Sequence, residues 1–212
     1  MTRLNEVLDY KSKYTENDVL VNKLNITNQE ELDKAERIIT TVKLADLYMK
    51  GITGNFDTEH YYSIHKYLFS GIYEFAGEVR SENIKKSFPF CLPQYIHSEL
   101  TTTLKKASID LYNISNEEDI ITFLAKYYSD LDVIHPFREG NGRTLREFLR
   151  QYVLKINDVI DFGEYELDYD KITDKEGYIM AIRIADTTCN IEPLKEYFRP
   201  CLVNKKEKNH VR

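Results

Sequence analysis

The sequence predicts an all-α domain with one short β-hairpin. Apolar residues recur at spacings of three and four along most of the chain, which is the pattern of amphipathic helices. Residues 79–93 change in character, because valine, isoleucine and phenylalanine are interspersed there with charged residues, serine and proline. A length of 212 residues, with 42% hydrophobic and 30% charged residues, suits one globular domain with a sizeable core.

The first helices are predicted from their apolar spacing and their end signals. Residues 1–28 show weak periodicity, and we interpret them as a partly ordered lead-in. A helix is expected from about residue 28 to 48, with Gly51 as its stop signal. Asp57 is a plausible N-cap for the next helix, which reaches about residue 72, and Gly77 ends that region.

A hairpin and two helices are expected in the middle of the chain. Pro89 and Pro93 would confine the hairpin to an exposed edge, because proline cannot donate to a central ladder. A helix over about 94–112 follows the hairpin. Ser115 and Glu118 then form a capping box for a helix over about 116–130.

The last third of the chain is expected to be helical after an active loop over 131–142. The helix after this loop should run to about Lys155, and a capping box of Thr173 and Glu176 should begin another that ends near Asp186. A final helix is expected over about 191–201. Without an internal repeat or linker, we expect a lead-in, one domain and a tail, with the boundaries 1–28, 29–201 and 202–212.

Composition limits the classes of function. A net charge of −6 argues against broad binding to nucleic acids or acidic membranes. No apolar run approaches 18 residues and no signal peptide opens the sequence, so we expect a cytoplasmic protein without a membrane span. Three cysteines without a pattern are expected to remain reduced thiols.

Residues 140–146 have the properties of a phosphate-binding turn. Gly140 and Gly142 lack a Cβ atom, so the backbone between them can turn sharply and present N–H groups to an anion. A strongly periodic helix follows, and its N-terminus favours phosphate through free N–H groups and the helix dipole. Arg143 and Arg146 lie three residues apart, on one polar side of that helix.

Two further groups near this turn suit transfer chemistry. Glu139 stands directly before the glycines and could hold Mg²⁺, which prefers oxygen ligands and few carboxylates. His135 is the nearby side chain that titrates close to neutrality without a special environment, so it is the candidate base. The other four histidines share no metal-binding spacing, and we interpret them as structural or surface groups.

Residues 135–146 read His-Pro-Phe-x-Glu-Gly-Asn-Gly-Arg-x-x-Arg, which resembles the defining motif of the Fic family at every position. Residues 22–26, 56–69 and 72–80 resemble further segments of the family in the same order, so the resemblance covers roughly residues 14–200. It implies the Fic fold, a helical bundle with a short β-hairpin called the flap. It also implies transfer of AMP from ATP to a hydroxyl group of a target protein.

The resemblance assigns roles to the residues of the motif. His135 would be the general base for the target serine, threonine or tyrosine, and Phe137 would anchor the loop in the core. Glu139 would hold Mg²⁺ between the α- and β-phosphates. The groups expected to bind the ATP phosphates are the backbone around Gly140 and Gly142, the Asn141 side chain, Arg143 and Arg146.

The family resemblance also implies where the target protein and the adenine ring of the nucleotide would bind. The flap, residues 81–93, would pair with an extended target segment by β-addition. Lys85 and Lys86 would lie near the nucleotide, and Tyr178 would flank the adenine. Toxins that resemble this sequence modify the ATPase subunits of DNA gyrase and topoisomerase IV, which are therefore candidate targets.

The sequence leaves more than one possibility for how the enzyme is inhibited and for which group it transfers. Fic enzymes are restrained by a helix with the pattern [ST]-x-x-x-E-[GN], whose glutamate pairs with the second arginine of the motif, here Arg146. Because the sequence resembles Fic toxins, we expect a small separate antitoxin to supply this helix. One match within the chain, residues 12–17, leaves self-inhibition by Glu16 as the alternative. Transfer of UMP or another phosphate group is the rival chemistry, although Gly142 argues against a Doc-type kinase, which has lysine there.

Overall fold

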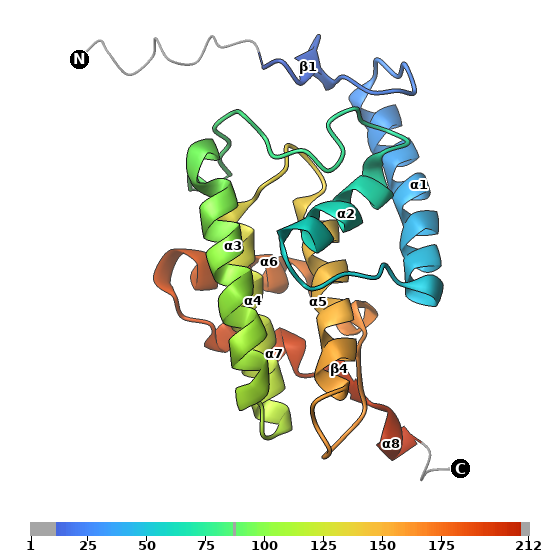
Figure 1. Ribbon diagram of the computed structural model, residues 1–212. Coiled ribbons are helices and arrows are strands. Elements are labelled where there is room, and N and C mark those ends of the chain that lie inside the picture. The colour runs from blue at the N-terminus through green and yellow to red at the C-terminus, as the bar shows by residue number, and fades with distance from the viewer. Residues whose placement is uncertain (1–11, 87, 209–212) are drawn as a thin grey trace, which may run out of the picture.

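Two helices that pack against each other, α4 (Glu117–Ile134) and α5 (Asn141–Asn157), form the centre of the structure. The computed structural model describes residues 12–86 and 88–208 of the chain. The loop 135–140 connects α4 to α5 and carries the first half of the motif, and the first turns of α5 carry the rest (Figure 1). The all-α class is confirmed, because helices make up most of the described chain.

Three helices from the first half of the chain surround this centre. The helix α1 (Gln29–Lys50) packs on α2 (Thr58–Phe69), α2 packs on α5, and α3 (Pro93–Asp110) packs on α4. Asp57 caps α2 as predicted, because its side chain accepts a hydrogen bond from the backbone of His60. The 3₁₀ turn η1 (Leu111–Asn113) extends α3.

Both predicted capping boxes were misplaced by one residue. Asn116, and not Ser115, caps α4, because its side chain accepts the N–H of Asp119 while Asp119 accepts the N–H of Ser115. The short carboxylate of Asp119 therefore replaces the predicted Glu118, and α4 continues to Ile134. Asp174, and not Thr173, caps α6 by accepting the N–H of Gly177.

Two C-terminal helices, α6 (Lys175–Thr188) and α7 (Glu192–Phe198), pack against α4. The 3₁₀ turn η2 (Tyr169–Lys171) precedes α6, and the short helix α8 (Lys205–Lys208) ends the described chain. Strand β3 (Tyr165–Leu167) pairs antiparallel with β4 (Leu202–Asn204), with Glu166 opposite Val203. The segment predicted as a tail from residue 202 thus begins with a strand that pairs with the body of the protein.

The flap forms less β-structure than the sequence predicts. Its pairing consists of one bridge between Lys85 and Pro89, and Pro93 is the first residue of α3 rather than part of a hairpin. Proline suits this first position, because the N–H it lacks would have no helical partner there. The other described strand pair is β1 (Thr15–Glu16) with β2 (Val19–Leu20), in the lead-in, where no strand was predicted.

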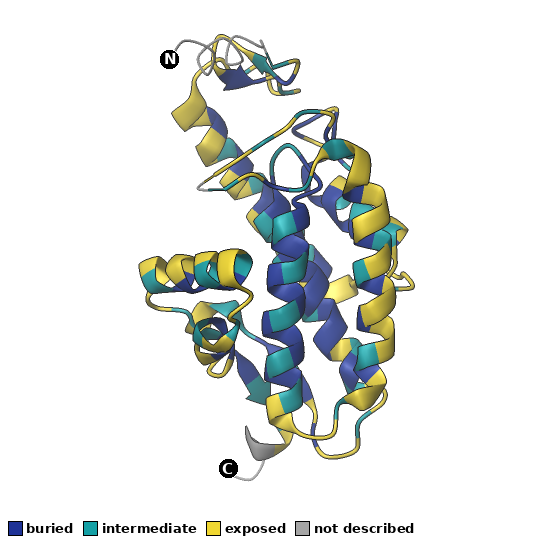
Figure 2. Cartoon of the chain, turned by 90° about the vertical axis from the view of Figure 1, so that its left-hand side faces the viewer, coloured by how far each residue is buried: buried dark blue, intermediate teal, exposed yellow. Residues whose placement is uncertain are grey.

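Figure 2 shows the buried residues concentrated in the inner helices, with exposed residues on the outward faces. The predicted face of α5 is fully buried, with Phe148, Leu149 and Val153 at 0% exposure. This burial fixes α5 against α2 and α4 and thereby fixes the position of the motif at its N-terminus. No described helix is both long and apolar enough to cross a lipid bilayer.

Candidate active site

The glycine turn at the start of α5 has the geometry that the sequence predicts for Gly140. Its φ angle is +80°, and a Cβ atom there would lie 2.3 Å from the ring of Phe69. Glycine is therefore required both by the left-handed backbone and by the close packing. A Cβ atom on Gly142 would lie 3.3 Å from Nη1 of Arg146, which leaves the turn close to that guanidinium group.

Asn141 has a structural role that was not expected from the sequence. Its Oδ1 accepts the N–H of Phe137 at 2.8 Å, and its Nδ2 donates to the carbonyl of Phe137 at 2.8 Å. Both ends of the amide therefore close the loop on itself, and donation to phosphate by the second N–H of Nδ2 stays a prediction. The expected anchor, Phe137, is 0% exposed.

His65 of α2 packs against the loop 135–140 and bonds to its backbone. Its ring stacks on Phe137 with centroids 3.7 Å apart. The N–H of Gly77 donates to Nδ1 at 2.8 Å, so Nε2 carries the proton and donates to the carbonyl of Glu139 at 2.9 Å. Burial lowers the pKa of His65 to about 3, and the ring is neutral. This histidine is structural, as predicted, but it supports the motif directly.

The imidazole of His135 is held in the form that a general base needs. Its Nδ1 lies 3.1 Å from the carbonyl oxygen of Asp132 and 3.4 Å from the Asp132 carboxylate. Both neighbours are acceptors, so Nδ1 carries the proton in the neutral ring and Nε2 keeps its lone pair. No other described group bonds to Nε2, and Phe90 of the flap stacks on the ring at 3.8 Å.

One carboxyl group, that of Asp132, lies beside this histidine, and a second, that of Asp186, lies beside Asp132. Burial favours a raised pKa for Asp132, but the hydrogen bond with His135 and its positive charge outweigh burial and lower it. Burial and the negative charge of Asp132 raise the pKa of Asp186, on α6, to about 8. Asp186 also accepts a hydrogen bond from Ser129 at 2.9 Å. The pair therefore holds one negative charge near neutrality, on the member next to His135.

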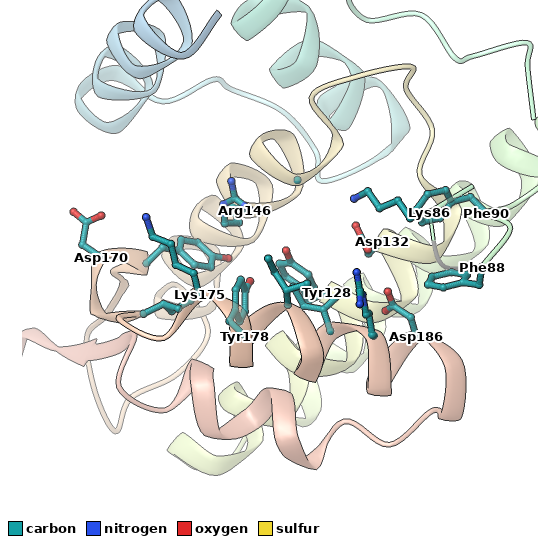
Figure 3. Close-up of a pocket in the computed structure, with 16 residues that line it drawn as sticks. Lys86, Phe88, Phe90, Tyr128, Asp132, Arg146, Asp170, Lys175, Tyr178 and Asp186 are labelled. Atoms are coloured by element: carbon teal, nitrogen blue, oxygen red, sulfur yellow. The ribbon is translucent and has the colours of Figure 1, made fainter. Parts of the chain in front are cut away.

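A cavity of about 680 Å³ opens beside the motif, between the flap, the N-terminal turn of α5 and helix α6. Figure 3 shows Lys86, Phe88 and Phe90 on the flap side and Tyr178 and Asp186 on the α6 side. Tyr178, which was expected near the adenine, lines this cavity together with apolar side chains. These apolar residues are Ile172, Ile179 and Ile182.

Arg146 also lines this cavity, among tyrosines (Figure 3). In the described part of the chain no carboxylate lies within 4.0 Å of its guanidinium group. Its polar neighbour is the hydroxyl group of Tyr128, and the hydroxyl oxygen of Tyr169, which lines the same cavity, is buried without a hydrogen-bond partner. A cation without a carboxylate partner beside an unpartnered hydroxyl group fits an anionic ligand with further polar groups, such as a nucleotide.

Arg143 and Lys85 lie elsewhere. Arg143 points to α1, where it pairs with Glu36 at 2.5 Å and donates to Thr40 at 3.2 Å. It does not line the cavity beside the flap, but together with Arg146 it lines a second pocket of about 420 Å³ on the other side of α5's first turns, near Tyr48 and Arg150. Lys85 is in the flap bridge, outside the cavity, whereas Lys86 lines it.

Glu139 fits the magnesium ion that the motif implies. Its side chain is 42% exposed, and both of its described contacts use Oε1: the N–H of Gly140 at 2.8 Å and Arg143 at 3.4 Å. The second carboxylate oxygen has no partner in the described structure. A single accessible carboxylate suits Mg²⁺ that takes its other ligands from phosphates and water, and the described residues contain no cluster of three metal-binding side chains.

Comparison with known proteins decides the family. Residues 55–153 match the model of the Fic/DOC family. The Sinorhizobium fredii protein y4lH, a probable protein adenylyltransferase, is 32% identical over 86% of this chain and 91% of its own length. The chain belongs to the Fic/DOC family.

Two further similar proteins are a much longer relative and a solved domain with a bound nucleotide. The protein adenylyltransferase VbhT of Bartonella schoenbuchensis is 32% identical over 76% of this chain, which spans only 33% of that relative. A solved Fic domain of a VirB-translocated effector from Bartonella quintana, with bound ADP, has a TM-score of 0.78 and 26% identity. It covers 92% of this chain, which in turn covers 95% of it.

Several residues of the site were not expected from the sequence. Asp132 precedes His135 by one helical turn, a spacing that brings side chains together, so this contact could have been foreseen. Glu36, Arg80 and Asp186 come from distant segments, and only the packing of α1, the flap and α6 brings them to the motif.

Proposed function

We propose that this Fic/DOC protein is an adenylyltransferase that transfers AMP from ATP to a hydroxyl group of a target protein. The observation that carries the proposal is one cavity that is lined by two neighbours of His135 and by Arg146, an arginine without a carboxylate partner among the described residues. Phe90 and Asp132 contact His135 and line the cavity that Arg146 also lines. The protein names of the relatives and the ADP bound to the Bartonella quintana domain support the same chemistry.

The reaction would proceed by one displacement at the α-phosphorus atom. Nε2 of His135 accepts the proton of the target hydroxyl as its oxygen bonds to the α-phosphorus. The bond from that phosphorus to the oxygen bridging to the β-phosphate breaks, and diphosphate leaves. The products are the AMP-protein and diphosphate, with the proton on His135, which later releases it to water.

The chain's own groups would position the nucleotide. Arg146 and the N-terminal turn of α5 around Gly142 would bind phosphate, and Lys86 would lie over it from the flap. Tyr178 and its isoleucine neighbours would hold the adenine. Glu139 would hold Mg²⁺, which, when bound, neutralises charge on the phosphates. Arg143 would need to leave Glu36 to reach them, so we assign it to orienting Glu139 and α1 in this state.

We place the target on the flap. A groove of about 700 Å³ lies between the flap, α3 and α4 and reaches Asp186 of α6; Phe88, Leu92 and Tyr95 line it among others. Leu92 and Tyr95 are exposed apolar residues, suited to an extended target segment. The subunits of DNA gyrase or topoisomerase IV remain our candidate targets, and a bacterial cytoplasm is the corresponding location.

The decisive experiment replaces the base. His135→Ala should abolish label transfer from α-³²P-ATP while ATP affinity changes less than about threefold, because the base acts on the hydroxyl only. His97→Ala, at an exposed position on α3, is the matched control. Label retained only from γ-³²P-ATP would instead indicate a phosphotransferase, and preference for UTP a uridylyltransferase.

A separate antitoxin remains our proposal for regulation. Arg146 has no carboxylate partner in the described chain, so the inhibitory glutamate would come from another protein. The internal candidate, Glu16, is exposed, lies in strand β1 rather than on a helix, and has no described contact with Arg146. The structure therefore gives no support to self-inhibition by this residue.

A further inference from the structure

Arg80 is a buried cation that is bound by carbonyl groups. Its exposure is 1%, and no carboxylate lies within 4.0 Å of it among the described residues. Burying a guanidinium group is costly unless its donors are satisfied. Here the side chain donates to four backbone carbonyls, those of Glu82, Cys91, Ile134 and His135.

These carbonyls belong to three segments that all meet at Arg80. Nε donates to the carbonyl of His135 at 2.8 Å, and Nη1 donates to that of Glu82, at the start of the flap, at 2.7 Å. Nη2 donates at 2.5 Å to Cys91, near the other end of the flap. The backbone N–H of Arg80 adds a bond to Pro136 at 2.9 Å. One side chain thus ties both ends of the flap to the residue of the base.

The same contacts control the surroundings of the imidazole. His135 ends α4 in the left-handed conformation, with φ +47°, which only a few per cent of residues other than glycine adopt. Phe90, which precedes Cys91, stacks on its ring with planes 10° apart. The carbonyl of His135 and the backbone next to Phe90 are therefore held by one group.

We propose that Arg80 is a positioning residue that clamps the flap onto His135 and is needed for the transfer step, not for ATP binding. It contacts neither the cavity nor the base's ring. A planar fork of five donors can reach carbonyls in several directions, whereas lysine presents its donors at one point. Only the predicted effect on AMP transfer rests on the proposed function; the predicted effect on the structure of the flap does not.

The test compares Arg80→Lys with Arg150→Lys. Arg150 is also largely buried, but it bonds to Glu147 and the carbonyl of Leu47, and it does not line the nucleotide cavity. We expect Arg80→Lys to lower the rate of AMP transfer by at least about 30-fold while the Kd for ATP changes less than about threefold. Arg150→Lys should change the transfer rate less than about threefold.

Hydrogen exchange provides a measurement that needs no activity. The amides of Lys86, Phe90 and Cys91 bond within the flap or to α4, so they should exchange at least about tenfold faster in Arg80→Lys only. The NMR signals of the His135 ring should also shift in this variant. If the wild type transfers no AMP, the proposed function fails, and exchange and NMR still decide on the clamp.

Two results would overturn the clamp. Arg80→Lys could keep the wild-type transfer rate and flap exchange, or it could lose ATP affinity and transfer in equal measure. If Arg80→Lys does not fold, Arg80→Gln serves instead, because it buries no charge but supplies fewer donors. Arg80→Gln should likewise lower the rate of AMP transfer while leaving the Kd for ATP nearly unchanged.

Discussion

The imidazole of His135 is surrounded by groups that leave one of its nitrogens open. Asp132 occupies Nδ1, Phe90 covers the ring, and Arg80 holds the carbonyl. This arrangement selects one tautomer and one orientation, which is the task of the third member in a nucleophile–base–orienter set. At the scale of single residues, the orientation and tautomer of the His135 ring therefore depend on neighbours that take no part in the proposed proton transfer.

Asp132→Asn tests this dependence. An amide can present N–H to Nδ1 and favour the wrong tautomer, so AMP transfer should fall by about tenfold with little change in ATP affinity. The measurement is the rate of label transfer across pH 6–9. Glu117→Gln, at the far end of α4, makes the same kind of change and should keep the wild-type profile. An unchanged rate in Asp132→Asn would show that the backbone carbonyl alone orients the ring.

Gly140→Ala tests the turn before α5. The left-handed backbone and the contact with Phe69 should together lower the free energy of unfolding by about 2–4 kcal/mol. Gly71→Ala is the control, because a Cβ atom there meets nothing within 4 Å and should cost much less. Urea denaturation measures both variants, and equal losses would contradict this account of Gly140.

Among elements, α2 and the flap support the motif loop from outside its own segment. His65 on α2 bonds to the loop at Glu139 and to Gly77, which leads towards the flap. The flap itself is held by α4 and Arg80 more than by its own single bridge. The loop is therefore rigid because separate elements bond to it, and not because of its own sequence.

The element-scale prediction concerns pH. The pKa of His65 is about 3 in the folded protein and close to 6.5 in the unfolded chain, so the unfolded chain binds its proton first as pH falls. The stabilisation by neutral His65 is complete above pH 6.5. It should be lost by about 1.4 kcal/mol per pH unit below that, towards pH 3.

Urea denaturation between pH 7.5 and 5 measures this loss. His65→Gln should flatten the curve relative to wild type, whereas His97→Gln, at an exposed position, should leave its slope unchanged. Parallel curves for wild type and His65→Gln would show that other groups cause the loss of stability in acid.

At the scale of the whole molecule, the two arginines of the motif have different partners. Arg143 forms an ion pair with Glu36 on α1. The Glu36 carboxylate also accepts a hydrogen bond from Tyr73. Arg146 has no carboxylate partner in the described part of the chain and opens to the nucleotide cavity. The isolated protein should therefore be active without release from an internal inhibitor.

Glu16→Gly tests this expectation. The residue is exposed in β1, so the substitution should change the rate of self-modification or target modification by less than about threefold. Glu74→Gly, at another exposed acidic position, controls for loss of charge. A rise of an order of magnitude in Glu16→Gly alone would indicate an inhibitory contact made in a different conformation.

The sequence by itself determined the helical class, the family resemblance and the candidate for the base. These are local properties: the apolar period of α5, the left-handed turn that needs Gly140, and the spacing within residues 135–146. The exact caps of α4 and α6 were missed because neighbouring serine, threonine, asparagine and aspartate compete for the same position. The flap was overestimated, since β-propensity without a partner strand does not make a ladder.

Only the tertiary structure decided what each polar group of the motif bonds to. The Asn141 amide is used by the loop and Arg143 by α1, while Arg146 remains for a ligand. Such assignments depend on distances between segments far apart in the chain, and buried polar groups take whichever partner packing brings within reach. For the same reason Arg80, which is remote from the motif in sequence, lies against the carbonyl of His135.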